Sequence, residues 1–267
     1  MFPLQTDSLP ANADSLRAAL EDSLRQVVRS PAGEMIVVED RSYPELNAIR
    51  LSLDGATVLD HLPPRPTVPK WTGQPALSVL DFEISARPLL VQGASVDLSC
   101  RARAVELVQA RDEKGRIVLL LSNAAEGKLE VGLAIADLEA LVLTAAKAAA
   151  AEGVSIEHVR IELKARTERA LDLLVQVRAK KLFFTAIVRI SGRAEIDEQL
   201  NARLVGLECT GDGSLGTLAC GFIAPHLQRF DGRAFPLLAL PLGEVKLRDV
   251  RIATGDKLRV TAAFGQT

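Results

Sequence analysis

The sequence predicts an α+β fold in which a long, strongly coiled antiparallel sheet wraps amphipathic helices and leaves an apolar groove or tunnel. Most segments alternate apolar and polar residues with the period of two that is typical of half-buried strands. A few stretches instead repeat their apolar residues at helical spacing. Aliphatic side chains must fill the interior, because hydrophobic residues make up 48% of the chain and aromatic residues only 4%.

The chain begins with a predicted helix and continues with strands. Asp14 or Ser15 is placed to cap a helix that runs to about Arg29, since leucines recur there every four residues. Alternation then predicts strands around residues 36–38, 49–53, 80–84, 96–102, 117–121 and 129–133.

A proline-rich segment gives the expected domain boundary. Residues 61–75 contain five prolines and predict an extended linker or edge loop. We therefore expect residues 1–75 to form an N-terminal helix and strands packed on the main body, and residues 76–267 to form that main body.

The second half repeats the pattern of helix and strands. A helix is predicted over residues 136–152, with Gly153 as its terminator, and another over residues 215–230, which Pro225 should kink. Strands are predicted over residues 154–163, 171–177, 182–190, 200–209, 245–252 and 258–264.

Two strands change the parity of their apolar positions partway. Ala102 and Ala104 give way to Val105 and Leu107, and Leu247 is followed by apolar residues at 250 and 252. A β-bulge or a strong bend in each strand accounts for this change.

Charge and leader sequence limit the classes of partner. The net charge of −2 comes from 32 basic and 34 acidic residues spread evenly, which predicts no nucleic-acid partner. The start of the chain lacks a basic region followed by an apolar one, and no run reaches membrane-spanning length. A cytoplasmic location is expected, or an envelope location for a chain that has lost its leader.

The cysteines and histidines predict no metal or cofactor. The three cysteines are an odd number without metal-like spacing, which favours buried thiols in a reducing compartment. In an exported protein, Cys209 and Cys220 could instead pair across the glycine-rich turn between them. The three histidines lie in separate elements without a metal-binding motif.

One motif offers an enzymatic alternative. Gly211, Gly213 and Gly216 form a G-x-G-x-x-G pattern between a predicted strand and a predicted helix, as in dinucleotide-binding proteins. Only 51 residues follow, however, and they end in a hairpin rather than a parallel sheet. We expect an ordinary glycine-rich turn, and we keep a nucleotide-binding enzyme as the third hypothesis.

Apolar residues exceed what one closed core needs. Residues 117–121, 182–184 and 235–242 are apolar on both faces of their predicted strands. Either both faces of the sheet are covered, or a seam between sheet and helices stays open and accepts acyl chains.

Three segments follow one another in a characteristic order: the apolar, proline-containing residues 86–93, the strand-to-helix transition at residues 133–138, and the leucine- and proline-rich residues 235–242 that precede a terminal hairpin. This succession resembles the LmeA-like bacterial phospholipid-binding proteins of the TULIP (tubular lipid-binding) superfamily. This resemblance implies a coiled sheet around a long helix and an apolar lumen that holds lipid.

We therefore expect a non-enzymatic protein that binds, and in one version transfers, phospholipid or fatty acyl chains. A scaffold protein without a ligand is the main alternative, and a dimer is compatible with either. The expected lipid-binding residues are Leu89, Leu90, Leu138, Leu141, Val142, Ala145, Phe183, Phe222 and Ile223. The expected apolar rim for transient docking at a membrane surface consists of Trp71, Phe235 and Leu237.

Overall fold

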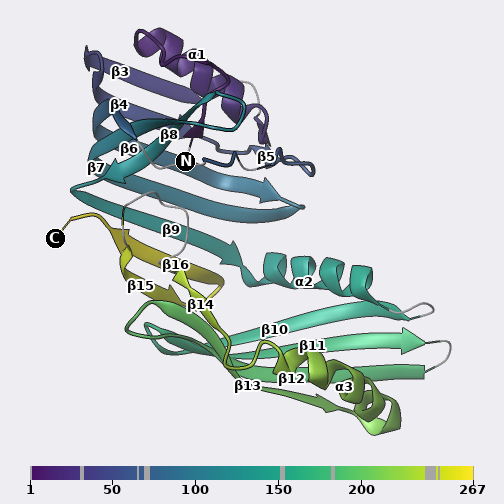
Figure 1. Ribbon diagram of the computed structural model, residues 1–267. Coiled ribbons are helices and arrows are strands. Elements are labelled where there is room, and N and C mark those ends of the chain that lie inside the picture. Colours follow the sequence, from purple (N-terminus) through teal and green to yellow (C-terminus); the bar gives the residue numbers. More distant parts are fainter. Residues whose placement is uncertain are drawn as a thin grey trace. The chain divides into compact units, whose positions relative to one another are not determined.

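The structure is a computed structural model that describes residues 2–30, 33–64, 66–68, 73–150, 154–181, 184–237, 245 and 247–266. Its strands outnumber its helices and form two open sheets, which confirms the α+β class (Figure 1). Neither sheet closes or curls strongly, so the predicted wrap of a coiled sheet around the helices is not confirmed.

The chain divides into two compact units. Unit 1 comprises Met1–Val131, Leu240–Asp249 and Thr261–Thr267, and unit 2 comprises Gly132–Ala239 and Val250–Val260. Both sides of residue 75, where the sequence places a boundary, belong to unit 1. The reason is that β4 (Glu45–Ser52) pairs in parallel with β6 (Gln74–Val91), which makes the N-terminal strands part of the same sheet.

The larger sheet is mixed rather than wholly antiparallel as predicted, and most of its strands belong to unit 1. The strand order is β15-β16-β9-β7-β6-β4-β3. Off this path, β8 pairs with β7 and carries β1 on its other side, and β5 pairs with β6 and carries β2. Besides β4, β5 also pairs in parallel with β6. The remaining bounds are β1 (Phe2–Pro3), β2 (Val28–Arg29), β3 (Ile36–Ser42), β5 (Thr57–Val58), β7 (Ala94–Arg111), β8 (Ile117–Asn123), β9 (Glu126–Ala134), β15 (Leu247–Ala253) and β16 (Lys257–Phe264).

Helix α1 (Ala13–Leu24) covers part of this sheet. Its N-cap is Asn12, not Asp14 or Ser15, because the Asn12 side chain accepts a hydrogen bond from the backbone of Ser15 and the Ser15 hydroxyl accepts one in return. The helix ends before Arg29 because Val28 and Arg29 form β2. Leu16, Ala19 and Leu20 form its buried face.

The parity change predicted in β7 is confirmed. Ala102, Val105 and Leu107 are all buried, and the switch falls at Ala104, which has a left-handed backbone with φ of 46°. The partner strand β6 changes parity at the same level, from buried Val79 to half-buried Phe82. Both strands therefore exchange faces together and keep their pairing on either side.

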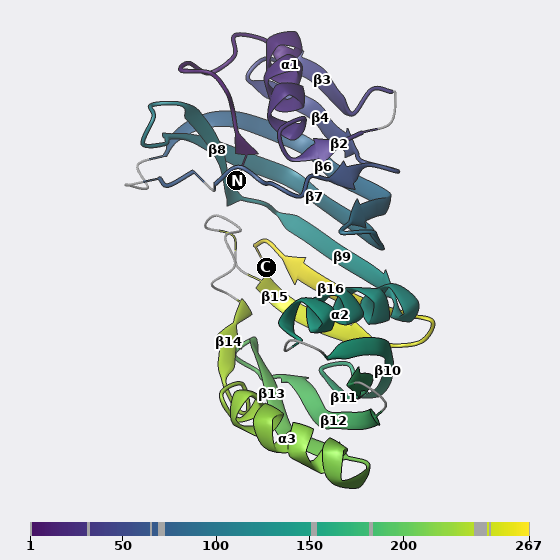
Figure 2. The same ribbon diagram turned by 90° about the vertical axis from the view of Figure 1, so that its right-hand side faces the viewer.

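Unit 2 contains an antiparallel sheet in the order β10-β11-β12-β13-β14 (Figures 1 and 2). Helix α2 (Ile135–Ala149) packs against β10, and α3 (Gly213–Gln228) packs against β12 and β13. The strands are β10 (Ser155–Thr167), β11 (Ala170–Lys181), β12 (Phe184–Ile196), β13 (Asn201–Gly211) and β14 (Ala234–Pro236).

One face of the sheet in unit 2 is apolar, and it is the face that receives α3. The register places Val159, Val177, Val188 and Gly211 side by side across four strands. A side chain at Gly211 would collide with the backbone of Gly216 in α3, so the first glycine of the predicted motif lets helix and strand approach closely.

Candidate functional site

The described part of unit 1 contains an apolar pocket of about 160 Å³. Five strands and β1 contribute to it, and every side chain that lines it is hydrophobic or a thiol. The lining residues are Phe2, Phe82, Ile84, Cys100, Ala102, Val105, Leu107, Leu121, Leu129 and Phe264. Such a pocket suits an apolar group, because a polar group buried there would have no hydrogen-bond partner.

Three aromatic rings line the pocket. The rings of Phe2 and Phe82 meet edge to face, with their centroids 5.8 Å apart. Phe264 lies on Gly127 of β9, where a Cβ atom would fall 2.1 Å from the phenyl ring. The small residues in the lining leave room between these rings.

Cys100 is the free thiol of the described chain and lines this pocket. Burial among hydrophobic side chains raises the pKa of the Cys100 thiol to about 11, because the thiolate would lose its hydration there. The thiol stays neutral at physiological pH and behaves as a small hydrophobic group.

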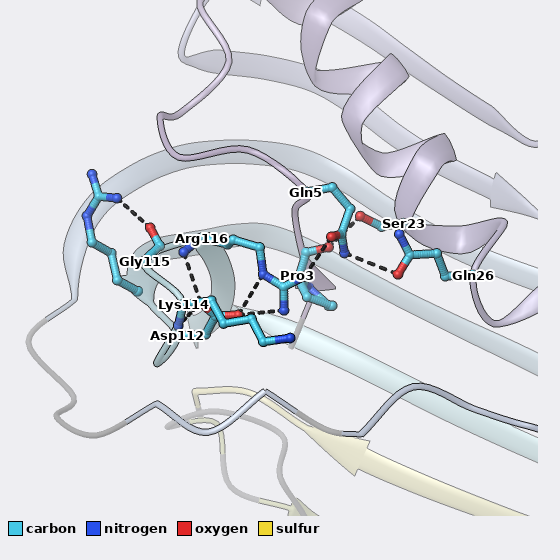
Figure 3. A network of polar contacts seen from close by, with 9 residues as sticks. Pro3, Gln5, Ser23, Gln26, Asp112, Lys114, Gly115 and Arg116 are labelled. Carbon is cyan, nitrogen blue, oxygen red and sulfur yellow. Dashed lines mark hydrogen bonds and ion pairs between the residues drawn. The ribbon is translucent and has the colours of Figure 1, made fainter.

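A second concave feature of unit 1 is a cleft of about 760 Å³ with a polar network in its wall (Figure 3). The buried carboxylate of Asp112 accepts hydrogen bonds from the backbone of Lys114 and Arg116 and pairs with the Arg116 guanidinium at 2.7 Å. Burial opposes the ionisation of Asp112, but these donors outweigh it and lower the carboxyl pKa. Arg116 continues the network by donating to Gln5.

In unit 2, the outer side of α3 is apolar and exposed. Leu215, Leu218 and Phe222 follow one another at helical spacing and expose 41, 59 and 71% of their surface. The helix contains no Lys, Arg, Asp or Glu. Large exposed apolar side chains in a row are typical of surfaces that contact a partner or a membrane.

The predicted lipid-binding residues are spread over several elements rather than gathered at the apolar pocket. Leu89 packs against the core cluster of Val28, Leu53, Ala56 and Ala86, and Leu90 is half-buried in β6. On α2, Leu138, Leu141 and Val142 are half-buried and Ala145 is exposed. On α3, Phe222 is exposed and Ile223 is half-buried. Phe183 lies outside the described residues.

The predicted membrane rim is partly described. Trp71 lies outside the described residues. Phe235 is 40% exposed and stacks under the guanidinium of Arg233, and Leu237 is half-buried. Within the proline-rich segment, the described Val68 packs against a buried cluster that includes Val118.

The sequence did not predict the apolar pocket of unit 1. Its residues come from six separated segments, and only the pairing of β6 with β7 brings Phe82 opposite Ala102. The available signal was the change of parity in these two strands. That change leaves small residues in the middle of the apolar face.

The glycine motif at residues 211–216 lies in an antiparallel setting. In the described pairings, β13 is antiparallel to both β12 and β14, so the parallel crossover of a dinucleotide site is missing. Asp212 sits at the N-terminus of α3 and holds both η nitrogens of Arg189, at 2.6 and 2.9 Å. This pairing lowers the pKa of Asp212 and places a carboxylate where a phosphate would bind.

Two of the three cysteines are not thiols. Cys209 of β13 and Cys220 of α3 form a disulfide, so the expectation of buried thiols is wrong for this pair and the alternative left open for it holds. The cause is geometric. The helix that follows the glycine turn folds back on β13 and brings the two Cα atoms to 5.5 Å.

Comparison with protein-family models, with curated proteins and with solved structures finds no match to this chain. Within the described ranges, no helix combines the length and the apolar character needed to cross a membrane.

Proposed function

We propose that this protein binds acyl chains or similar apolar groups without catalysing a reaction. The observation that supports this proposal best is the apolar pocket in unit 1, whose described wall contains no charged or amide side chain. An apolar cavity of about this size is large enough to take up a benzene-sized group. The pocket therefore fits one end of a lipid tail rather than a whole phospholipid.

The TULIP-like lumen stays a prediction from the sequence resemblance. Two features of unit 2 support it: an apolar sheet face and an α2 whose leucines are only half-buried. In this proposal the half-buried Leu138 and Leu141 line a groove, as the sequence predicts.

The disulfide bears on location. A bond between Cys209 and Cys220 is typical of an oxidising compartment, so we propose an envelope or extracellular location in place of the cytoplasm.

The test uses Cys100 as a reporter of occupancy. A bound fluorescent fatty acid should slow the alkylation of Cys100 by a small thiol reagent, because the thiol lines the pocket. Ala102→Leu should abolish both uptake and protection by filling the pocket, whereas Ala125→Leu, at an exposed position of unit 1, should leave both intact. Uptake by Ala102→Leu that equals wild type would exclude this pocket as the binding site. If Ala102→Leu does not fold, Gly127→Ala is the second variant. Its methyl group displaces the Phe264 ring, which lines the pocket, so it should also reduce uptake of the fatty acid.

A second candidate function is that of a scaffold, the alternative stated above. The exposed row of Leu215, Leu218 and Phe222 favours it, because such a row also fits a protein partner. Two measurements separate a membrane contact from a protein interface. Co-sedimentation of wild type, but not of Phe222→Ser, with vesicles indicates a membrane contact. Concentration-dependent self-association of wild type that is lost in Phe222→Ser indicates a protein interface.

A further inference from the structure

The cleft of about 760 Å³ in unit 1 is lined by polar and by apolar residues. Its polar wall consists of Gln5, Ser23, Gln26, Lys114 and Arg116, and its apolar wall consists of Pro3, Val27, Leu62, Pro63, Pro64 and Pro66. We propose that this cleft binds an amphiphile that carries a single anionic head, a carboxylate or a phosphate, on an apolar body. This inference does not depend on the apolar pocket.

The direction of the hydrogen bonds explains why the polar wall selects an anion (Figure 3). A guanidinium can only donate, so Arg116 requires Gln5 to present its amide oxygen, 2.7 Å away. The Gln5 amide nitrogen must then face Gln26 and donates to its oxygen at 3.3 Å. The chain of amides therefore ends with the Gln26 NH₂ group, a donor that no further described side chain accepts.

Asp112 does not compete with an anionic ligand, although it lies beneath the cleft. One carboxylate oxygen accepts the backbone N–H groups of Lys114 and Arg116, and the other accepts two N–H groups of the Arg116 guanidinium. These four donors use all its acceptor sites. Asp112 also neutralises the charge of Arg116, so it acts as a positioning residue.

Lys114 supplies the charge that remains. Its side chain is exposed and lines the cleft, and in the described part of the chain no carboxylate lies within ion-pair distance of its ammonium. Arg116 adds further donors, because only three of its five side-chain N–H groups are used by Asp112 and Gln5. One formal positive charge with several donors matches one anionic head.

The apolar wall of the cleft suits the apolar body of the ligand. Leu62 exposes 56% of its surface, and its neighbours in the cleft are proline rings, which offer no N–H donor. A free inorganic anion would leave this wall unused. An attached chain would cover it and would bind more tightly for each methylene group that it buries there.

The experiment uses isothermal titration calorimetry on the full-length protein. Four probes carry an eight-carbon chain with different heads: octyl phosphate, octanoate, octyl glucoside and octyltrimethylammonium. The fifth probe, inorganic phosphate, is a head without a chain. We expect the two anionic amphiphiles to bind most tightly. Lys114→Gln and Gln26→Glu should each weaken them on the order of tenfold, the usual size for loss of a charge-assisted hydrogen bond. Both positions are exposed, and Glu at 26 still accepts the bond from Gln5.

Matched controls come from the same unit. Gln74 accepts a bond from Gln109 as Gln26 does from Gln5, and Lys128 is an exposed lysine on β9, so Gln74→Glu and Lys128→Gln should leave binding unchanged. Binding of inorganic phosphate as tight as octyl phosphate would overturn the amphiphile in favour of a free-anion site. Equal binding of octyl glucoside, insensitive to both variants, would overturn the cleft and point to the apolar pocket instead, where the head is irrelevant.

Discussion

The disulfide between Cys209 and Cys220 should contribute a large share of the stability of unit 2. The bridge joins residues 11 apart in sequence. In the chain-entropy model, closing a loop of this length restricts the unfolded chain by about 3 kcal/mol at 25 °C. The replacement of both cysteines by serine should therefore lower the free energy of unfolding by about that amount, and the urea midpoint by on the order of 1 to 2 M.

The assay is urea unfolding of the double variant beside wild type and Cys100→Ser, which leaves the bridge intact. Thiol titration of the denatured protein gives an independent count, since wild type should show one reactive thiol and not three. A double variant as stable as wild type, or three free thiols in protein purified without reductant, would refute the reasoning.

Three further predictions follow from the geometry of unit 1. At pH 8, Cys100 should react with iodoacetamide on the order of 100-fold more slowly than an unhindered thiol, because its pKa of about 11 leaves few thiolates; a rate equal to that of the unfolded protein would contradict this burial. Gly127→Ala should destabilise the protein by about 1 to 3 kcal/mol in urea unfolding, because its methyl group displaces the Phe264 ring; an unchanged midpoint would mean that the ring is not seated there. The lowered pKa of Asp112 predicts stability that is present above its ordinary value of 3.8 and lost as the pH falls through the lower folded pKa, so the acid-induced loss should be shallower in Asp112→Asn.

The local elements were predictable because their signals are local. Alternation identified the strands β11 and β12, and helical spacing placed α2 over residues 136–152 against the observed Ile135–Ala149. The N-cap of α1 was misplaced by two or three residues because Asn12, Asp14 and Ser15 all have capping side chains. The reciprocal hydrogen bonds between Asn12 and Ser15 identify Asn12 as the cap.

The arrangement of strands was not predictable in the same way. An alternating strand has the same pattern whether its neighbour runs parallel or antiparallel, so nothing local indicated that β4 would join β6 in parallel. That pairing makes β4 and β6 neighbours in one sheet, although the proline-rich residues lie between them in the sequence.

The apolar pocket exists because small residues stand among large ones. Ala102 and Cys100 face Phe82 and Ile84 across the pairing of β6 and β7, and a leucine at either small position would fill much of the space. A fully enclosed empty cavity of this volume would cost on the order of 4 kcal/mol, an upper bound for a pocket that opens to solvent. If the pocket only reflects imperfect packing, Ala102→Leu stabilises the protein and changes nothing else. If it holds a ligand, the same substitution raises stability and removes binding together, and the second result is the one that the apolar wall leads us to expect.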